Sequence, residues 1–598
     1  MEGLEVTVLL GLTILVGALL APRVRLAMPL VLVILGLALG FVPALREIQL
    51  PPETVLLLFL PVMLFWESLT TSLRSIRRDF RYIVPMSTLL VVASAFAVAG
   101  VGLLFGMPWE TALILGAAVA PPDATAVAAL GRLLPRRMFM KLKAESLTND
   151  GTALVLYAIA VSLAFGGHID ALSVTGTVLV SYLGGIAAGA VVAALGYLLL
   201  RRATSTVVIN VALLLIPFTS FLLAELIDAS GVLAVVVAGL AIAYVSPRIT
   251  TAASRRQADA AWPFGVLLLN GALFVLIGLE VQYVVHEISP AAIGRLVLVT
   301  LAVWVSLLVV RFLFQLLSAP FQRHAGPTPP RGLRNRSRVV STVAGMRGAV
   351  SLAIALSVPV TAEAGGALVG RDEIVFVTAG VILLSLLVQG PLLPAVVRWA
   401  RFPADHAEDE EYELAVRTIS GAALAALDDL AAEHGVADEV RDRVRADGYQ
   451  MLEFANARAF AREQALVDAE VRALDALLDE PDPLGSAPSG GRAERGALES
   501  AAVETDIVDG AGGSLRDDLG DGGTLQMIAT STDIDLTQRS PLIRHEEHTR
   551  LRLALLDRKR EVLLGLRKAG TVDDLVVRRI AARLDLEQVR LQGIEDFD

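Results

Sequence analysis

The stretch 116-GAAVAPPDATAVAAL-130 carries one acidic residue and two consecutive prolines inside an otherwise apolar segment. Pro121 and Pro122 remove backbone donors and clash with the preceding turn, so a helix here should be broken at its centre. The apolar segment around it, about 109–131, is long enough to cross a bilayer core of roughly 30 Å. A break at membrane depth is tolerated only beside protein, a cavity or a bound ion, which makes Asp123 a functional candidate.

Apolar segments of similar length recur as far as residue 400, and they predict thirteen membrane spans. Barrel strands would be shorter and alternating, so the expected fold class is an all-α polytopic membrane protein. Of the 598 residues 55% are hydrophobic, and the mean hydropathy of +0.64 is too high for a soluble chain. The predicted spans are about 4–21, 26–45, 51–71, 82–105, 109–131, 141–165, 171–200, 205–227, 230–246, 262–284, 292–318, 338–360 and 373–397.

Basic residues follow the odd-numbered spans, whereas the loops after even-numbered spans are short, poor in Arg and often acidic. Arg and Lys mark cytoplasmic loops, so this alternation predicts an outside N-terminus and a cytoplasmic C-terminus. The net charge of −10 divides into +9 over residues 1–401 and −19 over residues 402–598. Because the basic excess lies in the loops, we expect no nucleic-acid partner.

The acidic C-terminal part is predicted to divide into three segments. Residues 402–480 have the periodicity of amphipathic helices, and residues 541–598 look helical again. Residues 481–540, rich in Pro, Gly, Ser and Asp, predict a disordered linker. This cytoplasmic tail is a candidate site for a regulatory ligand or partner.

Ionisable groups at membrane depth are costly, so each one in a predicted span is a candidate for function. Four carboxylates and one cation are predicted to lie deep in the spans. They are Glu67 late in span 3, Asp123 in span 5, Glu145 and Asp150 in span 6, and Arg347 in span 12.

Span 12 is interrupted like span 5, because Gly345 and Gly348 flank Arg347 in the middle of it. Two interrupted helices far apart in sequence indicate a secondary transporter built from inverted repeats, with its site where the helices meet. The two spans are seven apart, and an odd separation is what inverted topology requires. In span 6, Ser146 and Asp150 share a helix face and offer hard oxygens that suit a small alkali cation or a proton.

Three stretches resemble the monovalent cation:proton antiporter family in its sodium/proton exchanger branch. They are 120-APPDATAV-127, 145-ESLTNDGTA-153 and 347-RGAVSLA-353, against family patterns close to A-P-T-D-P-V-A-V, E-S-L-x-N-D-G-T-A and R-G-A-V-S-L-A. The resemblance covers residues 1–400 nearly end to end. Pro122 stands where the family usually has Thr, and Ala124 where it usually has Pro.

The resemblance implies a dimeric, elevator-type antiporter whose core domain moves against a dimerisation domain. It implies that Asp150 binds the proton or the cation, with Ser146, Asp123 and a backbone carbonyl of Pro122 completing the site. Glu67 is expected to reach this site and meet Asn149.

Two further roles follow from the resemblance. Glu145 is expected to form a buried ion pair with Arg347, which would hold span 6 against span 12. Asn149 stands where electrogenic relatives have a second Asp, and one titrating group fewer implies electroneutral exchange.

Plainer interpretations stay open for three of these residues. Asp123 could serve only as the N-cap of the second half-helix. Glu67 lies near a span end and could reach the cytoplasmic interface. Asn149 could be only an interhelical hydrogen-bond former.

We therefore predict exchange of Na⁺, or else K⁺ or Li⁺, for H⁺ across the plasma (inner) membrane, serving pH homeostasis without a cofactor. The alternatives are a K⁺-selective antiporter and a cation channel gated by the tail. An enzyme is not expected, since the chain has no cysteine and no span holds a Ser/His pair or a metal-binding His pair.

Overall fold

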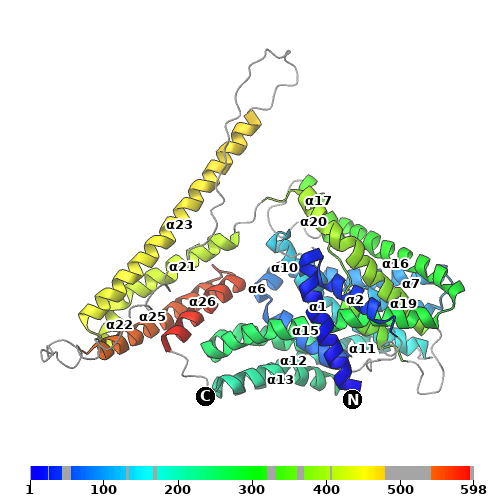
Figure 1. Cartoon of the computed structure of the whole chain (residues 1–598), viewed down its shortest axis with the longest axis horizontal. Helices are drawn as coiled ribbons and strands as arrows, with labels where there is room; N and C mark the ends of the chain where they lie inside the picture. The colour runs from blue at the N-terminus through cyan, green and yellow to red at the C-terminus, as the bar shows by residue number, and fades with distance from the viewer. Residues whose placement is uncertain are drawn as a thin grey trace, which may run out of the picture. The chain divides into compact units, whose positions relative to one another are not determined.

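A computed structural model of the chain describes residues 2–24, 26–42, 55–128, 133–165, 171–318, 331–359, 370–403, 407–478 and 540–592. Every regular element within these residues is helical (Figure 1). Among them, nine helices are long and apolar enough to span a membrane, and three shorter apolar helices accompany them. Each predicted span falls on one helix or on consecutive helices, but the count of thirteen crossings stays a prediction. The predicted linker, 481–540, lies outside the described residues except for Ser540.

The apolar part runs from α1 to α20. Its first half comprises α1 (Glu2–Val24), α2 (Met28–Leu39), the π-helical turn η1 (Val55–Phe59), α5 (Leu60–Leu69), α6 (Leu73–Ser87), α7 (Leu89–Leu104), α8 (Trp109–Val119), α9 (Ala124–Ala128) and α10 (Arg136–Ala164). Its second half comprises α11 (Ala171–Leu179), η3 (Val180–Gly184), α12 (Gly185–Arg202), α13 (Thr206–Glu225), α14 (Gly231–Ile249), α15 (Ala252–Glu287), α16 (Pro290–Leu317), α17 (Arg331–Val343), α18 (Ala349–Leu356), α19 (Arg371–Leu384), η4 (Ser385–Gln389) and α20 (Gly390–Ala400).

Helix starts follow local sequence signals. Ser230 caps α14, because its hydroxyl accepts a hydrogen bond from the backbone N–H of Leu233 at 3.2 Å. Pro290 begins α16, where its missing N–H costs nothing. Gly370 precedes α19 with a φ of +90°, a left-handed conformation that favours glycine.

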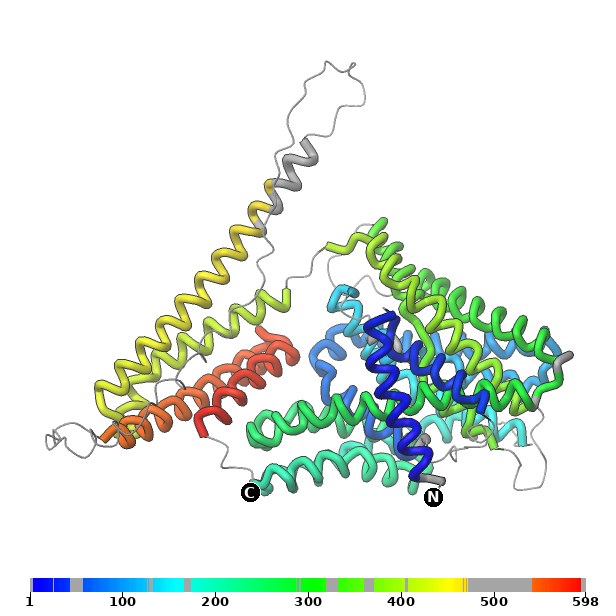
Figure 2. The backbone as a smooth tube through the Cα atoms, viewed as in Figure 1, coloured from blue at the N-terminus to red at the C-terminus, as the bar shows by residue number. Residues whose placement is uncertain are grey.

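Two helical bundles make up the apolar part. One, here the site bundle, comprises α6–α10 and α16–α20, which pack mainly with one another. The other, here the flanking bundle, comprises α1, α2, α5 and α11–α15. Figure 2 shows α1 and α2 (dark blue) crossing over α15 (green), the long helix that also contacts α19. Each bundle has its own buried apolar cluster, and a third cluster lies along the seam of α2 and α15 with α18 and α19.

The chain divides into two compact units, residues 1–416 with 560–598 and residues 417–559. This division differs from the predicted segments, because the last part of the tail groups with the membrane part. The tail helices are α21 (Ala407–Ala425), α22 (Leu427–Glu433), α23 (Asp438–Leu478), α25 (Pro541–Ala569) and α26 (Asp574–Gln592).

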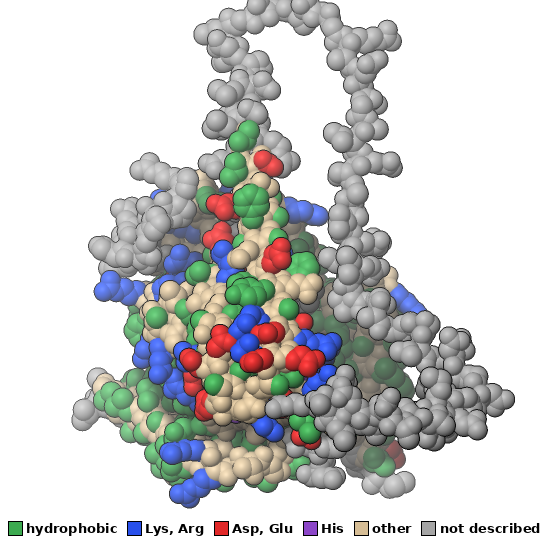
Figure 3. Space-filling model, turned by 90° about the vertical axis from the view of Figure 1, so that its left-hand side faces the viewer, with side chains coloured by type: hydrophobic (Ala, Val, Ile, Leu, Met, Phe, Trp, Pro, Cys, Tyr) green, Lys and Arg blue, Asp and Glu red, His purple; other side chains and the backbone are tan. Residues whose placement is uncertain are grey.

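The smaller unit, residues 417–559, has a core of its own. Leu427, Val444 and Leu551 are buried together, and Arg552 donates to Asp447 at 2.8 Å. Acidic and basic side chains intermingle on its surface, which Figure 3 views face on. Such exposed pairs contribute little stability, so the apolar contacts are what hold these helices together.

Helices α2 and α15 approach closely enough to exclude side chains at their crossing. A Cβ on Gly36 would lie 2.1 Å from the carbonyl oxygen of Val275. A Cβ on Gly278 would lie 2.4 Å from both the backbone N of Leu37 and the backbone O of Val33. Small residues at helix crossings commonly let two backbones approach closely in a membrane.

Replacing Gly278 with Ala should therefore destabilise the protein by about 1–3 kcal/mol, because a rigid backbone cannot yield to the new methyl group. Thermal unfolding of the purified protein in detergent measures this loss. Gly265→Ala, on the same helix, is the control, since nothing lies within 4 Å of its Cβ position. Equal melting temperatures for the two variants would contradict the close approach.

Candidate ion-binding site

The site begins where two non-helical segments cross. Helix α8 ends at Val119 and α9 begins at Ala124, while α17 ends at Val343 and α18 begins at Ala349. Between them the backbone N–H of Asp123 donates to the carbonyl oxygen of Met346 at 2.8 Å. The helix breaks predicted at Pro121-Pro122 and around Arg347 thus lie against each other.

Asp123 occupies this crossing and is 7% exposed. Its Oδ1 accepts from the backbone N–H of Thr125 at 2.7 Å and from the Thr125 hydroxyl at 2.6 Å, so it caps α9 as the plainer interpretation expected. Its Oδ2 lies against Gly348, where an added Cβ would come within 1.8 Å. The second carboxylate oxygen of Asp123 therefore lies beside the first turn of α18.

Helix α10 satisfies backbone groups that the break in α8–α9 leaves open. The Ser146 hydroxyl accepts from the backbone N–H of Ala124 at 3.0 Å. The Asn149 side-chain amide donates to the carbonyl oxygen of Pro122 at 2.9 Å. Both side chains are buried, at 5% and 0% exposure. The predicted Pro122 carbonyl ligand is thus engaged by Asn149, and no hydrogen bond in the described residues joins Asn149 to Glu67.

Asp150 lies one turn beyond Ser146 on α10 and is 4% exposed. No hydrogen bond within the described ranges involves its carboxylate. Asp123 and Glu67 are the charged groups that act on it electrostatically. Burial and two acidic neighbours disfavour a bare negative charge at this position.

The three carboxylates do not form a preformed metal cage. In the part of the chain that the structure describes, no group of three or more His, Asp or Glu side chains is placed to hold a metal ion. Besides these carboxylates, the crossing offers hydroxyl and backbone oxygens, which are ligands that alkali and other hard cations take.

The predicted pairing of Glu145 with Arg347 was wrong. Glu145 is fully buried and binds Arg311 of α16 through both carboxylate oxygens, with 3.1 Å between the Arg311 Nη2 and Oε2. Arg311 also donates from Nε to the carbonyl oxygen of Ser341 at 3.0 Å. Arg311 lies within predicted span 11 but was not among the predicted site residues, although a cation in a span is a candidate for function.

Arg347 is instead neutralised by backbone carbonyls. Its Nε donates to Val119 O at 2.9 Å and its Nη2 to Ala120 O at 3.2 Å, while its Nη1 donates to Gly345 O. Val119 and Ala120 are the last residues of the first half-helix, whose carbonyls have no helical partner and carry the negative end of the helix dipole. Arg347 thus supports the site by capping α8 rather than by pairing with an acid.

A buried carboxylate placed beside the crossing of two interrupted helices is the arrangement expected of an ion-coupled secondary transporter. The family model described as "Sodium/hydrogen exchanger, transmembrane" matches residues 11–399. The chain belongs to this family of monovalent cation:proton antiporters and is a multi-pass secondary transporter, not an enzyme.

Individual relatives agree with the family. An uncharacterized Na⁺/H⁺ exchanger of Mycobacterium tuberculosis is 37% identical over 611 residues, which cover 100% of this chain and 97% of that protein. The Na⁺/H⁺ antiporter ApNhaP of Aphanothece halophytica is 30% identical over 64% of this chain and 71% of its own. The solved sodium proton antiporter MjNhaP1 of Methanocaldococcus jannaschii has a TM-score of 0.53 at 18% identity, covering 68% of this chain and 100% of that one, which shows a shared fold.

We predict that Gly348→Ala lowers exchange activity by roughly 100-fold, because its methyl group would displace the Asp123 carboxylate by more than an ångström. Ion exchange by the variant reconstituted in vesicles provides the measurement. Gly100→Ala in α7 is the control, since nothing lies within 4 Å of its Cβ position. Full activity of Gly348→Ala would show that the position of Asp123 does not matter.

Arg311→Met should destabilise the protein by about 3–5 kcal/mol, because it leaves Glu145 as an unpaired buried charge. The double variant Glu145→Leu/Arg311→Met should recover most of that loss, as thermal unfolding in detergent would register. The same single and double variants with Arg347→Met in place of Arg311→Met serve as the comparison. Stronger coupling of Glu145 to Arg347 than to Arg311 would contradict the observed pairing.

Proposed function

We propose that the protein exchanges Na⁺ for H⁺ across the plasma membrane and that Asp150 binds the two ions in competition. The observation that carries this proposal is the placement of Asp150, which is buried, lies beside the crossing of the two helix breaks and has the acidic residues Asp123 and Glu67 acting on it. Such a carboxylate needs either a proton or a cation at each stage. Competition for one group is sufficient to couple the two fluxes.

The remaining ligands are expected around the same crossing. Ser146 and Asp123 offer oxygens on either side of the break, and Glu67 of α5 supplies a third acidic group near Asp150. Ala124 stands where a proline is usual in this family, and its N–H is the donor to Ser146. Pro122 stands where the family usually has Thr, and proline has no side-chain hydroxyl. The backbone carbonyl oxygen is therefore the ligand that Pro122 can offer. Preference among Na⁺, K⁺ and Li⁺ will depend on these two departures.

Exchange is proposed to be electroneutral. Asn149 occupies the α10 position next to Asp150 and is engaged with the Pro122 carbonyl. An amide does not titrate in this range, so Asp150 is left to carry one ion at a time.

Transport is proposed to follow an elevator mechanism with thirteen spans and inverted repeats. The division of the membrane part into a site bundle and a flanking bundle supports this view. The site bundle holds Asp123, Asp150 and Arg347, so its movement as a body would carry the bound ion. The flanking bundle would then be the fixed part and the dimerisation domain of a homodimer.

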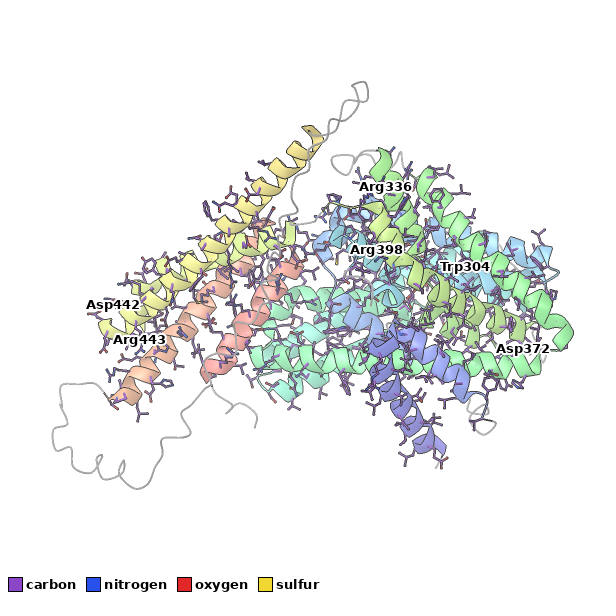
Figure 4. The ribbon with its side chains drawn as sticks, turned by 45° about the horizontal axis from the view of Figure 1, so that its top comes forward. Trp304, Arg336, Asp372, Arg398, Asp442 and Arg443 are labelled. Atoms are coloured by element: carbon purple, nitrogen blue, oxygen red, sulfur yellow. The ribbon has the colours of Figure 1, made fainter. Side chains whose placement is uncertain are left out.

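The N-terminus is proposed to lie outside and the tail in the cytoplasm. Arg336 and Arg398 lie near each other at one end of the site bundle, and Asp372 lies at the far end of the run α19–α20 (Figure 4). Arg74, Arg136 and Arg255, from three loops predicted to be cytoplasmic, all lie near α26. Both groupings support the predicted alternation of basic and acidic loops. The role would be pH homeostasis, with no cofactor besides the transported ions.

Asp150→Asn should abolish cation-dependent proton movement, because an amide binds neither a proton nor a cation with the needed affinity. Proteoliposomes with an internal pH dye measure the exchange for Na⁺, K⁺ and Li⁺ in turn. Asp372→Asn, on an exposed aspartate, is the control and should retain exchange. Full exchange by Asp150→Asn would overturn the assignment, and cation flux insensitive to an opposing pH gradient would favour a channel.

A further inference from the structure

The last part of the tail contacts both bundles of the membrane part. This clasp segment, residues 567–585, comprises the end of α25, the turn at 570–573 and the first three turns of α26. Val576, Val577 and Ile580 on its helix are buried. Figure 1 shows α26 beside the start of α15.

The first attachment is to the start of α6 in the site bundle. Ser72 donates to Asp573 Oδ2 at 3.3 Å and to Asp574 Oδ2 at 3.2 Å. Ser75 donates to Asp573 Oδ2 and the backbone N–H of Arg74 to Asp574 Oδ2, each at 3.2 Å. The two carboxylates thus meet the N-terminus of α6, which is the positive end of its dipole.

A residue of α10 strengthens this first attachment. Arg136, the first residue of α10, lies 3.7 Å from Asp573 and 3.2 Å from Glu408. The backbone N–H of Asp573 donates in turn to Glu411 at 2.9 Å. Two helices of the site bundle are therefore tied to one turn of the tail.

The second attachment is to the flanking bundle. Arg255 of α15 binds Asp585 through two hydrogen bonds, from Nε at 2.7 Å and from Nη2 at 2.6 Å. The Asp585 side chain is only 5% exposed and also accepts from Arg560 at 2.8 Å. Arg567 donates to the carbonyl oxygen of Tyr244 in α14 at 2.9 Å and lies over its ring at 4.6 Å. Bidentate guanidinium–carboxylate pairs are among the stronger and more directional polar contacts.

Between the two attachments lies a cavity of about 120 Å³. Its walls come from the end of α5, from α14, from α15 and from α26, and they include Trp66, Tyr244, Trp262, Asp259 and Arg578. Trp66 directly precedes Glu67, the acidic residue that acts on Asp150. The clasp segment thus forms one wall of a cavity that is lined mainly by the flanking bundle and reaches Leu73 of α6 in the site bundle.

We infer that the clasp segment restrains the two bundles against each other and must release one of them before transport can proceed. The inference rests on the proposed movement of the site bundle. Hydrogen bonds weaken steeply with distance and angle, so a displacement of a few ångströms cannot leave both attachments intact. The docked clasp therefore favours one position of the bundles, and its release lowers the free energy needed to reach the other.

Asp585→Ala in the full-length protein should raise the initial rate of exchange in proteoliposomes by roughly five-fold or more, the scale of a modest coupling between two sites. Arg255→Ala/Asp585→Ala should be no faster than the single variant, because both changes remove one contact. Glu587→Ala, an acidic residue of the same helix, is the control and should match the wild type. An unchanged or lower rate in Asp585→Ala would overturn the inference.

Cross-linking provides a test that does not depend on weakening α26. The chain has no cysteine, so pairs introduced at Ser75 with Asp573 and at Arg255 with Asp585 would be the only thiols. A cleavable bifunctional thiol reagent should leave exchange active when either pair alone is joined. It should stop exchange when both are joined, and reduction should restore it.

The two possible failures are distinguishable in this experiment. Absence of exchange in the wild type and in the uncross-linked variant would count against the proposed function. Exchange that continues at the uncross-linked rate with both pairs joined would count against the clasp alone.

Discussion

The crossing of two non-helical backbone segments is the constraint on which the rest of the membrane part depends. The hydrogen bond from the Asp123 N–H to Met346 O joins them, and every other backbone group freed by the breaks needs a partner away from water. Ser146, Asn149 and Arg347 supply those partners. With few exceptions, the side chains that surround the site are thus ones that also form hydrogen bonds with backbone groups of the two breaks. Asp150, the proposed ion-binding residue, differs, because its carboxylate accepts no hydrogen bond from a backbone group in the described residues.

Charge at the site is balanced in two ways, by one buried ion pair and by backbone carbonyl groups. Glu145 and Arg311 neutralise each other as a buried pair that joins α10 to α16. Arg347 is balanced by half-helix carbonyls, which hold partial negative charge where α8 ends. Both arginines are thus engaged with partners other than Asp150. This separation agrees with the proposed exchange of one ion at a time.

The sequence predicted the all-helical fold class and the positions of the helices, because these depend on local signals. Runs of apolar residues predict helices, Pro121-Pro122 predicts a break, and Asp150 is conspicuous at membrane depth. The partners of each group could not be predicted in the same way. Glu145 could pair with any cation in another span, and only the packing of α16 against the site bundle selects Arg311. The clasp segment was missed for a similar reason, since Ser72 and Asp573 form part of no periodic pattern.

The central claim is that proton and cation compete for Asp150, and proton release on cation binding tests it most directly. Purified protein in detergent, in a weakly buffered solution, would be titrated with Na⁺ while the released protons are measured. The account predicts about one proton released per cation bound in the wild type and none in Asp150→Asn. Cation binding without proton release, or unchanged release in the variant, would contradict it.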